Sequence, residues 1–300
     1  MDFLSVTDLG REGLAHVLAV AAAIKADPRP VAGRLGGKKV GLFFEKPSTR
    51  TRVSCEVAAA DLGAVPVVLK QDEVGLGKRE SVADVARTLD RYLDVLAFRV
   101  FRHSDLVTVA DHADAPVINL LSDREHPCQA LADLQTLAEA RPLAGASLAF
   151  VGDGNNVCHS LLLGAALTGV SMRVASPPGY EPAAEIMEQA RTLAGPGVEI
   201  EAGEDPAEAV RNADAVYTDV WASMGQEGEA AERRRLFEPY RVDEALFALA
   251  GERAIFLHCL PAHRGDEVTD GVADHERSRI FDQAENRMHA FKALLLHVAG

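Results

Sequence analysis

Short runs of apolar residues alternate with longer segments in which apolar residues recur at helical spacing. In the first half of the chain the short runs predict strands, and the longer segments between them predict helices. The expected strands are Lys39–Phe44, Val65–Leu69, Val95–Phe98 and Val117–Leu121, and the expected helices are Arg52–Leu62, Ser81–Tyr92, Ser104–Ala113 and Ala130–Ala140.

A second series of the same kind follows Arg141–Gly145, which is the best candidate for a linker. Strands alternating with helices favour parallel sheets covered by helices on both faces. The pattern therefore predicts an α/β fold of two doubly wound parallel-sheet domains joined by helices, residues 1–140 and 141–284. An apolar helix at Glu285–Val298, within 285–300, has no strand after it and is expected to pack back onto the first domain. The second series comprises strands Ser147–Val151, Met172–Ala175, Val198–Glu201, Ala215–Thr218 and Ala254–His258, with helices Asn156–Leu167 and Glu181–Leu193.

Composition and charge narrow the possible partners. The 300 residues are 48% hydrophobic and 25% charged, which is typical of a globular protein with sizeable cores. A formal net charge of −14 repels nucleic acid and anionic membranes at long range. A bound anion therefore requires a local cluster of donors.

The cysteines and the N-terminal segment predict a cytoplasmic protein. Cys55, Cys128, Cys158 and Cys259 lie far apart and form no CxxC pair, which argues against a disulfide framework and fits a reducing compartment. The start of the chain lacks the basic and apolar regions of a signal peptide, and no apolar stretch approaches membrane-spanning length.

The segment FEKPSTRTR, Phe44–Arg52, follows a predicted strand and opens a helix. Free backbone N–H groups and the positive end of the helix dipole make such a turn suitable for phosphate. Ser48, Thr49 and Thr51 offer hydroxyl donors, and Arg50 offers a guanidinium fork. A plain N-cap with surface arginines is the alternative, but the interleaved arginines favour a phosphate site.

The segment HPCQ opens the next helix. Pro127 suits a first helical position, and His126 and Gln129 would be able to contact a carbonyl oxygen and an amide. Taken alone, this pattern is equally compatible with a buried structural histidine.

The turn GDGNNV, Gly152–Val157, resembles a dinucleotide-binding turn only weakly. The third glycine is missing, and Ser176 and two prolines stand where an acidic residue would end the next strand. The two adjacent asparagines, Asn155 and Asn156, are instead suited to the carboxylate and ammonium of an amino acid.

Two further strand ends carry chemistry. Asp219–Glu227, DVWASMGQE, puts a carboxylate beside a flexible turn, and HCLPAHRG puts Cys259 at the end of a strand. A zinc site formed by Cys259, His258 and His263 lacks a clear fourth ligand and is disfavoured. A buried, inert cysteine is the ordinary alternative for Cys259.

These segments occur together and in one order, from about Gly41 to Leu296. With AFR at Arg99 and AENRMHAFKA at Arg287, they resemble the aspartate/ornithine carbamoyltransferase family. STRTR and HPCQ are shared across that family, whereas SMG and HCLP point to its ornithine enzymes.

The resemblance implies transfer of a carbamoyl group from carbamoyl phosphate to the side-chain amine of L-ornithine, giving citrulline and phosphate, with no metal or organic cofactor. By analogy, Ser48, Thr49, Arg50, Thr51 and Arg287 bind the phosphate. The carbonyl is polarised by Thr51, Arg99 and His126, and positive charge from Arg99 and His126 would stabilise the tetrahedral intermediate. The carbamoyl nitrogen is bound by Gln129 and the backbone near Cys259 and Leu260. Ornithine is bound by Asn156, Asp219, Ser223 and Met224, which leaves Cys259 near the attacking nitrogen as a base or as a positioning group.

The resemblance also implies a homotrimer, or a multiple of it, with sites at subunit interfaces. One departure concerns this assembly: Gly75 stands where many family members have a glutamine that reaches the neighbouring subunit, so that contact is missing or is replaced, for instance by Lys78.

Other functions remain open from sequence alone. A carbamoyltransferase acting on putrescine, an acylated ornithine or aspartate is the nearest alternative, although Asp219 and the SMG turn favour a zwitterionic amino acid. An oxidoreductase is disfavoured by the incomplete glycine pattern. A ligand-binding paralogue without activity is disfavoured by the intact arginines, His126, Gln129 and Cys259.

Overall fold

The computed structural model describes residues 1–222 and 227–300, and these form two compact units. The first unit comprises residues 1–132 and 285–300, and the second comprises residues 133–284. Two helices run from one unit into the other along the chain, α6 (Pro127–Ala140) and α13 (Ile280–Ala299). No helix in the described parts of the chain combines the length and the apolar character needed to cross a membrane.

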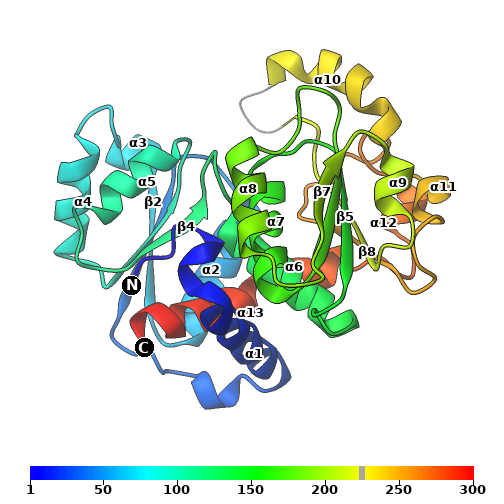
Figure 1. The fold of residues 1–300 in the computed structure, drawn as a ribbon. Coiled ribbons are helices and arrows are strands. Elements are labelled where there is room, and N and C mark those ends of the chain that lie inside the picture. Colours follow the sequence, from blue (N-terminus) through cyan, green and yellow to red (C-terminus); the bar gives the residue numbers. More distant parts are fainter. Residues whose placement is uncertain (223–226) are drawn as a thin grey trace. The chain divides into compact units, whose positions relative to one another are not determined.

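The first unit is built on a four-stranded sheet with strand order β2-β1-β3-β4, in which every pairing is parallel. One face of this sheet carries Phe43, Leu96 and Phe98, and α4 and α5 pack against them. The segments that connect these strands form helices α2 to α5, which are labelled in Figure 1. The bounds are β1 (Lys39–Phe44), α2 (Thr49–Asp61), β2 (Val65–Lys70), α3 (Gln71–Val74), α4 (Val82–Asp90), β3 (Val95–Arg99), α5 (His103–Ala110) and β4 (Val117–Leu121).

Two helices from opposite parts of the sequence lie side by side in this unit, α1 (Gly10–Ala26) and the red C-terminal part of α13 (Figure 1). Lys25 Nζ donates to Asn286 Oδ1 over 2.9 Å, and the rings of His16 and His297 lie 6.1 Å apart. The end of α1 thus lies beside the earlier part of α13, and the middle of α1 lies beside the end of α13, so the two helices run antiparallel. Short 3₁₀ turns at Val6–Leu9 and Arg29–Val31 flank α1.

The second unit is built on a five-stranded parallel sheet with strand order β7-β6-β5-β8-β9. Its central strands are apolar almost throughout, as expected for strands covered on both faces. The bounds are β5 (Ser147–Val151), α7 (Asn156–Thr168), β6 (Ser171–Ala175), α8 (Ala184–Leu193), β7 (Ile200–Gly203), α9 (Pro206–Val210), β8 (Ala215–Thr218), α10 (Ala230–Phe237), α11 (Glu244–Phe247), β9 (Ile255–His258) and α12 (Asp270–Ala273), with 3₁₀ turns at Glu227–Glu229 and Glu238–Tyr240.

The predicted fold of two parallel-sheet α/β domains is confirmed. Several boundaries differ for local reasons. Helix α2 begins at Thr49 instead of Arg52, because Ser48 caps it and accepts a hydrogen bond from the backbone of Thr51. Helix α13 begins at Ile280, five residues earlier than expected, and α8 begins at Ala184 instead of Glu181.

Candidate functional site

Polar side chains gather at the carboxyl ends of the strands in each unit, where α/β sheets bind ligands. In the first unit they form what we call the cationic cluster, made of Lys46, Ser48, Thr51, Arg99, His126 and Arg287. In the second unit they form what we call the thiol cluster, made of Asn155, Asp219 and Cys259.

The cationic cluster is organised around the first turn of α2. Ser48 Oγ donates to Thr51 Oγ1 over 3.0 Å, and Thr51 is completely buried. Arg287, on α13, reaches this turn and donates from Nη2 to Thr51 Oγ1 over 2.6 Å. The two hydroxyls and the buried guanidinium are thereby held together at a helix N-terminus.

Positive groups from neighbouring strand ends complete the cluster. Arg99 is the last residue of β3 and is 7% exposed, and β3 pairs with β1 so that Arg99 lies beside Phe44. Burial, followed by the Arg99 charge, lowers the pKa of the Lys46 ammonium. These positive side chains repel one another, although the protein as a whole has a net charge of −14. A bound anion would relieve this local repulsion.

His126 lies in the same cluster as a neutral imidazole. Burial, and then the charges of Arg287 and Arg99, hold the pKa of His126 well below its ordinary value. This direction favours a neutral, hydrogen-bonding ring at His126, with the arginines carrying the positive charge of the cluster.

The remaining residues of the predicted phosphate site lie nearby in the chain with different exposure. Thr49 is the exposed first residue of α2, Arg50 is half-buried, and Gln129 is buried in the first turn of α6. A cavity of about 840 Å³ is lined by Ser48 and Thr49 and also by Lys78, from the segment in which the family glutamine is absent.

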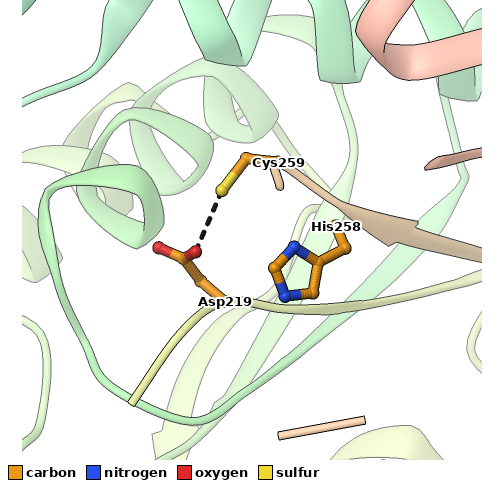
Figure 2. Close-up of side chains that lie close together, drawn as sticks. All are labelled: Asp219, His258 and Cys259. Atoms are coloured by element: carbon orange, nitrogen blue, oxygen red, sulfur yellow. Dashed lines mark hydrogen bonds between the residues drawn. The ribbon is translucent and has the colours of Figure 1, made fainter. Parts of the chain in front are cut away.

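In the thiol cluster, the strand ends of β8 and β9 bring Asp219 and Cys259 together. Cys259 Sγ donates to Asp219 Oδ1 over 3.0 Å, as Figure 2 shows. The other oxygen, Oδ2, accepts from Asn155 Nδ2 over 2.8 Å. Burial, then the charge and hydrogen bond of Asp219, raise the pKa of the Cys259 thiol well above its ordinary value, so the group is a thiol at neutral pH.

The turn after Cys259 is held by a buried hydrogen bond between a histidine and a carboxylate. His258 Nε2 lies 3.0 Å from Glu267 Oε1, and His258 Nδ1 accepts from the backbone N–H of Leu260 over 2.9 Å. Leu260 adopts a φ of 60°, an uncommon value for a branched residue, and the Leu260–Pro261 bond is cis.

Asp219, His258 and Cys259 place potential ligand atoms within 4.8 Å of one another (Figure 2). Both ring nitrogens of His258 are engaged, however, one as acceptor and one as donor. The histidine holds the turn and offers no lone pair to a metal ion in this arrangement.

In the GDGNN turn, packing explains the second glycine, Gly154. A Cβ at Gly154 would lie 2.2 Å from the backbone nitrogen of Pro182, so only glycine fits. Beside it, Asp153 pairs with Arg233 over 2.8 Å, and Arg233 also donates to the carbonyl of Trp221 over 2.9 Å. Burial raises the pKa of Asp153 to about 6, against the opposing effect of Arg233.

The predicted acceptor residues are only partly covered by the structure. Asn156 is half-buried at the first position of α7, and Asp219 is buried. Ser223 and Met224 lie outside the described residues. Sequence reasoning did not assign Lys46, although it lies inside the FEKPSTRTR motif, and it named Asn155 only as one of two adjacent asparagines suited to an amino acid.

The architecture and the cationic cluster are those of α/β proteins that hold a small anion at a strand-to-helix turn. The chain matches the carbamoyl-P binding domain of aspartate/ornithine carbamoyltransferase over residues 1–139, and the Asp/Orn binding domain over residues 144–298. The chain belongs to the aspartate/ornithine carbamoyltransferase family.

Individual relatives agree with this assignment. The chain is 53% identical over 300 residues to the ornithine carbamoyltransferase of Parasynechococcus marenigrum (strain WH8102), covering 100% of this chain and 94% of the relative. The structure of ornithine carbamoyltransferase from Pyrococcus furiosus is similar with a TM-score of 0.96 at 46% identity, covering 100% and 97% of the two chains. An acetylornithine transcarbamylase complexed with acetylcitrulline is similar with a TM-score of 0.89 at 31% identity, covering 100% and 99%.

Proposed function

We propose that this chain transfers the carbamoyl group of carbamoyl phosphate to the side-chain amine of L-ornithine, giving L-citrulline and phosphate. The observation that carries the proposal is the cationic cluster, in which Arg287 and Thr51 are joined at a helix N-terminus of an acidic protein. The names of the relatives at about 50% identity over the whole chain support the ornithine substrate.

Carbamoyl phosphate would bind to the first domain, residues 1–140 with 285–300. The hydroxyls of Ser48, Thr49 and Thr51, with Arg50 and Arg287, would hold the phosphate. Arg99 and Thr51, with the neutral ring of His126, would donate to the carbonyl oxygen as negative charge develops on it, and Gln129 would accept from the carbamoyl amide. Because His126 is neutral, the charge that stabilises the tetrahedral intermediate comes from the arginines.

L-ornithine would bind to the second domain, residues 141–284. Asp219 would pair with the α-ammonium, with Asn156, Ser223 and Met224 completing the contacts to the two ends of the amino acid. The neutral side-chain amine then attacks the carbonyl carbon; the new C–N bond forms, the C–O bond to phosphate breaks, and one amine proton is released.

Cys259 would lie near the attacking nitrogen, with the backbone at Cys259 and Leu260 accepting from the carbamoyl nitrogen. Since its raised pKa keeps Cys259 protonated at neutral pH, we assign it a positioning role and not that of a base. The chemistry would use groups of the chain itself, without a metal or organic cofactor.

The working form would be a cytoplasmic homo-oligomer, a trimer or a multiple of it. Exposed valines on α2 and on the edge strand β2 support an interface on the first unit, namely Val53, Val57 and Val65. Lys78 lines a cavity with Ser48 and Thr49, which supports it as a substitute for the glutamine that Gly75 replaces. The four free cysteines fit a reducing compartment.

The test is citrulline formation by the purified protein supplied with carbamoyl phosphate and ornithine, with putrescine, N-acetylornithine and aspartate as parallel acceptors. We expect turnover with ornithine alone and loss of it in Arg50→Ala. The matched control is Arg87→Ala, an exposed arginine of α4 in the same unit. Turnover with a different amine would retain the phosphate site and overturn the ornithine assignment, whereas inactivity with every acceptor would indicate a ligand-binding paralogue.

A further inference from the structure

Three buried polar side chains form a closed hydrogen-bonded group in the second unit, which we call the polar trio. Asp133 on α6, Tyr217 on β8 and Gln283 on α13 are each at most 1% exposed. Asp133 Oδ1 accepts from Gln283 Nε2 over 2.6 Å, and Asp133 Oδ2 accepts from the Tyr217 hydroxyl over 3.2 Å. Gln283 Nε2 also donates to the Tyr217 oxygen over 3.2 Å, so each member contacts the other two.

The polar trio is joined to the end of β9 through Gln283. In the described parts of the chain β9 is the outermost strand of its sheet, and the segment between α12 and α13 covers its outer side. The Phe256 N–H donates to the Arg277 carbonyl over 3.1 Å, and the Phe256 carbonyl accepts from the Arg279 N–H over 2.9 Å. The N–H of His258, two residues further on, faces the same side of the strand, and Gln283 Oε1 accepts from it over 2.9 Å. The side chain of Gln283 therefore continues a cover that backbone groups provide earlier along β9.

The polar trio fixes the orientation of the Gln283 amide. The amide nitrogen donates to the carboxylate of Asp133 and to the oxygen of Tyr217, which leaves the amide oxygen for the His258 N–H. Burial, followed by the charge of Asp133, raises the pKa of the Tyr217 phenol well above its ordinary value, so Tyr217 remains a donor at neutral pH. A flipped amide would set oxygen against a carboxylate and nitrogen against a backbone N–H, which loses both bonds.

His258 is the residue at which the turn that carries Cys259 begins. The His258 ring holds the later part of this turn, because its Nδ1 accepts from the Leu260 N–H over 2.9 Å. Gln283 holds the start of the same turn through the His258 backbone. A shift of that backbone would move Cys259 and Leu260 together, and a misplacement of about 1 Å can lower a reaction rate by about a hundredfold.

We propose that Gln283 is a positioning residue of the acceptor site, which holds the backbone of His258 and thereby places Cys259. The other two members of the polar trio keep its amide oxygen directed at His258. This proposal rests on the function proposed above, in which the turn after β9 lies beside the attacking amine. An apolar side chain at this position would fill the space without the cost of burying an amide, but it would offer the His258 N–H no acceptor.

The first test is backbone hydrogen–deuterium exchange of the full-length protein, followed by mass spectrometry on overlapping peptides that isolate His258. Gln283→Met keeps an unbranched side chain of similar length and removes the acceptor. We expect the His258 amide to exchange about tenfold faster in this variant. In citrulline assays kcat should fall by about tenfold, because the turn is displaced. Exchange or kcat equal to that of the wild type would overturn the proposal.

A matched pair of double variants removes the effect of leaving a buried carboxylate without its donor. Asp133→Asn with Gln283→Glu exchanges the amide and the carboxylate, so position 133 donates to position 283 and the His258 N–H keeps its acceptor. Asp133→Asn with Gln283→Met retains the first change and removes that acceptor. We expect slow exchange at His258 and near wild-type kcat in the first double variant, and fast exchange and reduced kcat in the second. Equal behaviour of the two would overturn the proposal, even if Gln283→Met alone fails to fold.

Ser147→Ala controls for stability within the same unit, since it removes a hydroxyl that donates to Asp214 Oδ2 over 2.9 Å at the start of β5. It should lower the midpoint of thermal unfolding and leave both kcat and the exchange of His258 unchanged. If Ser147→Ala and Gln283→Met lowered kcat equally at equal loss of midpoint, Gln283 would act through stability alone and the proposal would be overturned. Absence of turnover in the wild type would instead refute the proposed function, and the exchange measurements would still decide whether Gln283 holds the turn.

Discussion

Arg287 donates to Thr51 over 2.6 Å, although 236 positions separate the two residues along the chain. The contact places a guanidinium from α13 on the first turn of α2, where Ser48 also bonds to the Thr51 hydroxyl. The cationic cluster of the first unit therefore depends on side chains that lie far apart in the sequence, with Thr51 as their common partner.

Thr51→Val should weaken the binding of carbamoyl phosphate. Valine keeps the shape of threonine but leaves the Arg287 donor without its oxygen, and hydrogen bonds to charged groups contribute about 1.5–3 kcal/mol. We expect the KM for carbamoyl phosphate to rise by about tenfold or more, measured by initial-rate kinetics. Thr108→Val is the control, since Thr108 bonds only locally to the Ser104 carbonyl on α5; an equal effect in both variants would contradict the role given to Thr51.

The raised pKa of Asp153 should make the free energy of unfolding depend on pH. Its folded pKa of about 6 lies above the ordinary value of 3.8, so folding takes up a proton between these values. The contribution to stability is full below pH 3.8 and is lost as the pH rises through 6. Relative to Asp153→Asn, the wild type should lose about 2 kcal/mol in the free energy of unfolding between pH 4 and 7.

Urea titrations followed by circular dichroism at several pH values provide this comparison for Asp153. The control is Asp84→Asn, an exposed carboxylate of α4 that should show no such difference. A difference between wild type and Asp153→Asn that does not vary with pH would contradict the burial of the carboxyl.

Gly154→Ala should destabilise the second unit, because the added Cβ would lie 2.2 Å from the backbone of Pro182 and neither backbone can move aside freely. Overpacking of this kind costs about 1–3 kcal/mol. The KM for ornithine should rise as well, since Asn155 follows directly and bonds to Asp219. Gly203→Ala is the matched control, with nothing within 4 Å of its added Cβ. Thermal unfolding of the two variants tests the prediction, and equal midpoints would refute it.

Glu267→Gln should loosen the turn that carries Cys259. The Glu267 carboxylate accepts from the His263 backbone N–H over 2.6 Å and from the buried His258 ring. A neutral amide weakens both bonds, and we expect kcat to fall by about tenfold, corresponding to about 1.4 kcal/mol. Citrulline assays compare this variant with Glu276→Gln, an exposed position near α12; retention of full activity in Glu267→Gln would count against a role for the hydrogen bond between Glu267 and His258.

Much of the fold follows from periodicity alone. The strands Lys39–Phe44 and Ser147–Val151 were predicted to the residue, because parallel strands covered on both faces are continuous apolar runs. Helix α1 was not predicted, although Leu14, Val17 and Leu18 have the required spacing and are buried. The helical spacing of these apolar residues is visible in the sequence, so this helix could have been predicted from sequence alone.

The site was less predictable, for reasons of tertiary packing. The chemistry of Ser48 and Thr51 could be inferred from a strand-to-helix turn, but the approach of Arg287 depends on how α13 packs, and only family resemblance indicated it. Adjacent asparagines present a different difficulty: sequence cannot distinguish which of the two caps the helix. Asn155 does so, accepting from Val157 and Cys158, and it reaches Asp219 as well.

The first unit is formed by two separate segments of the chain, and this affects the order in which its parts become available during synthesis. Residues 133–284 make up the whole second unit, whereas the first unit needs residues 285–300 in addition to residues 1–132. A ribosome working from the N-terminus therefore finishes every part of the second unit before it makes Arg287. The first unit therefore cannot form the contact between Thr51 and Arg287 until its second segment, residues 285–300, has been synthesised, even though Thr51 is made early.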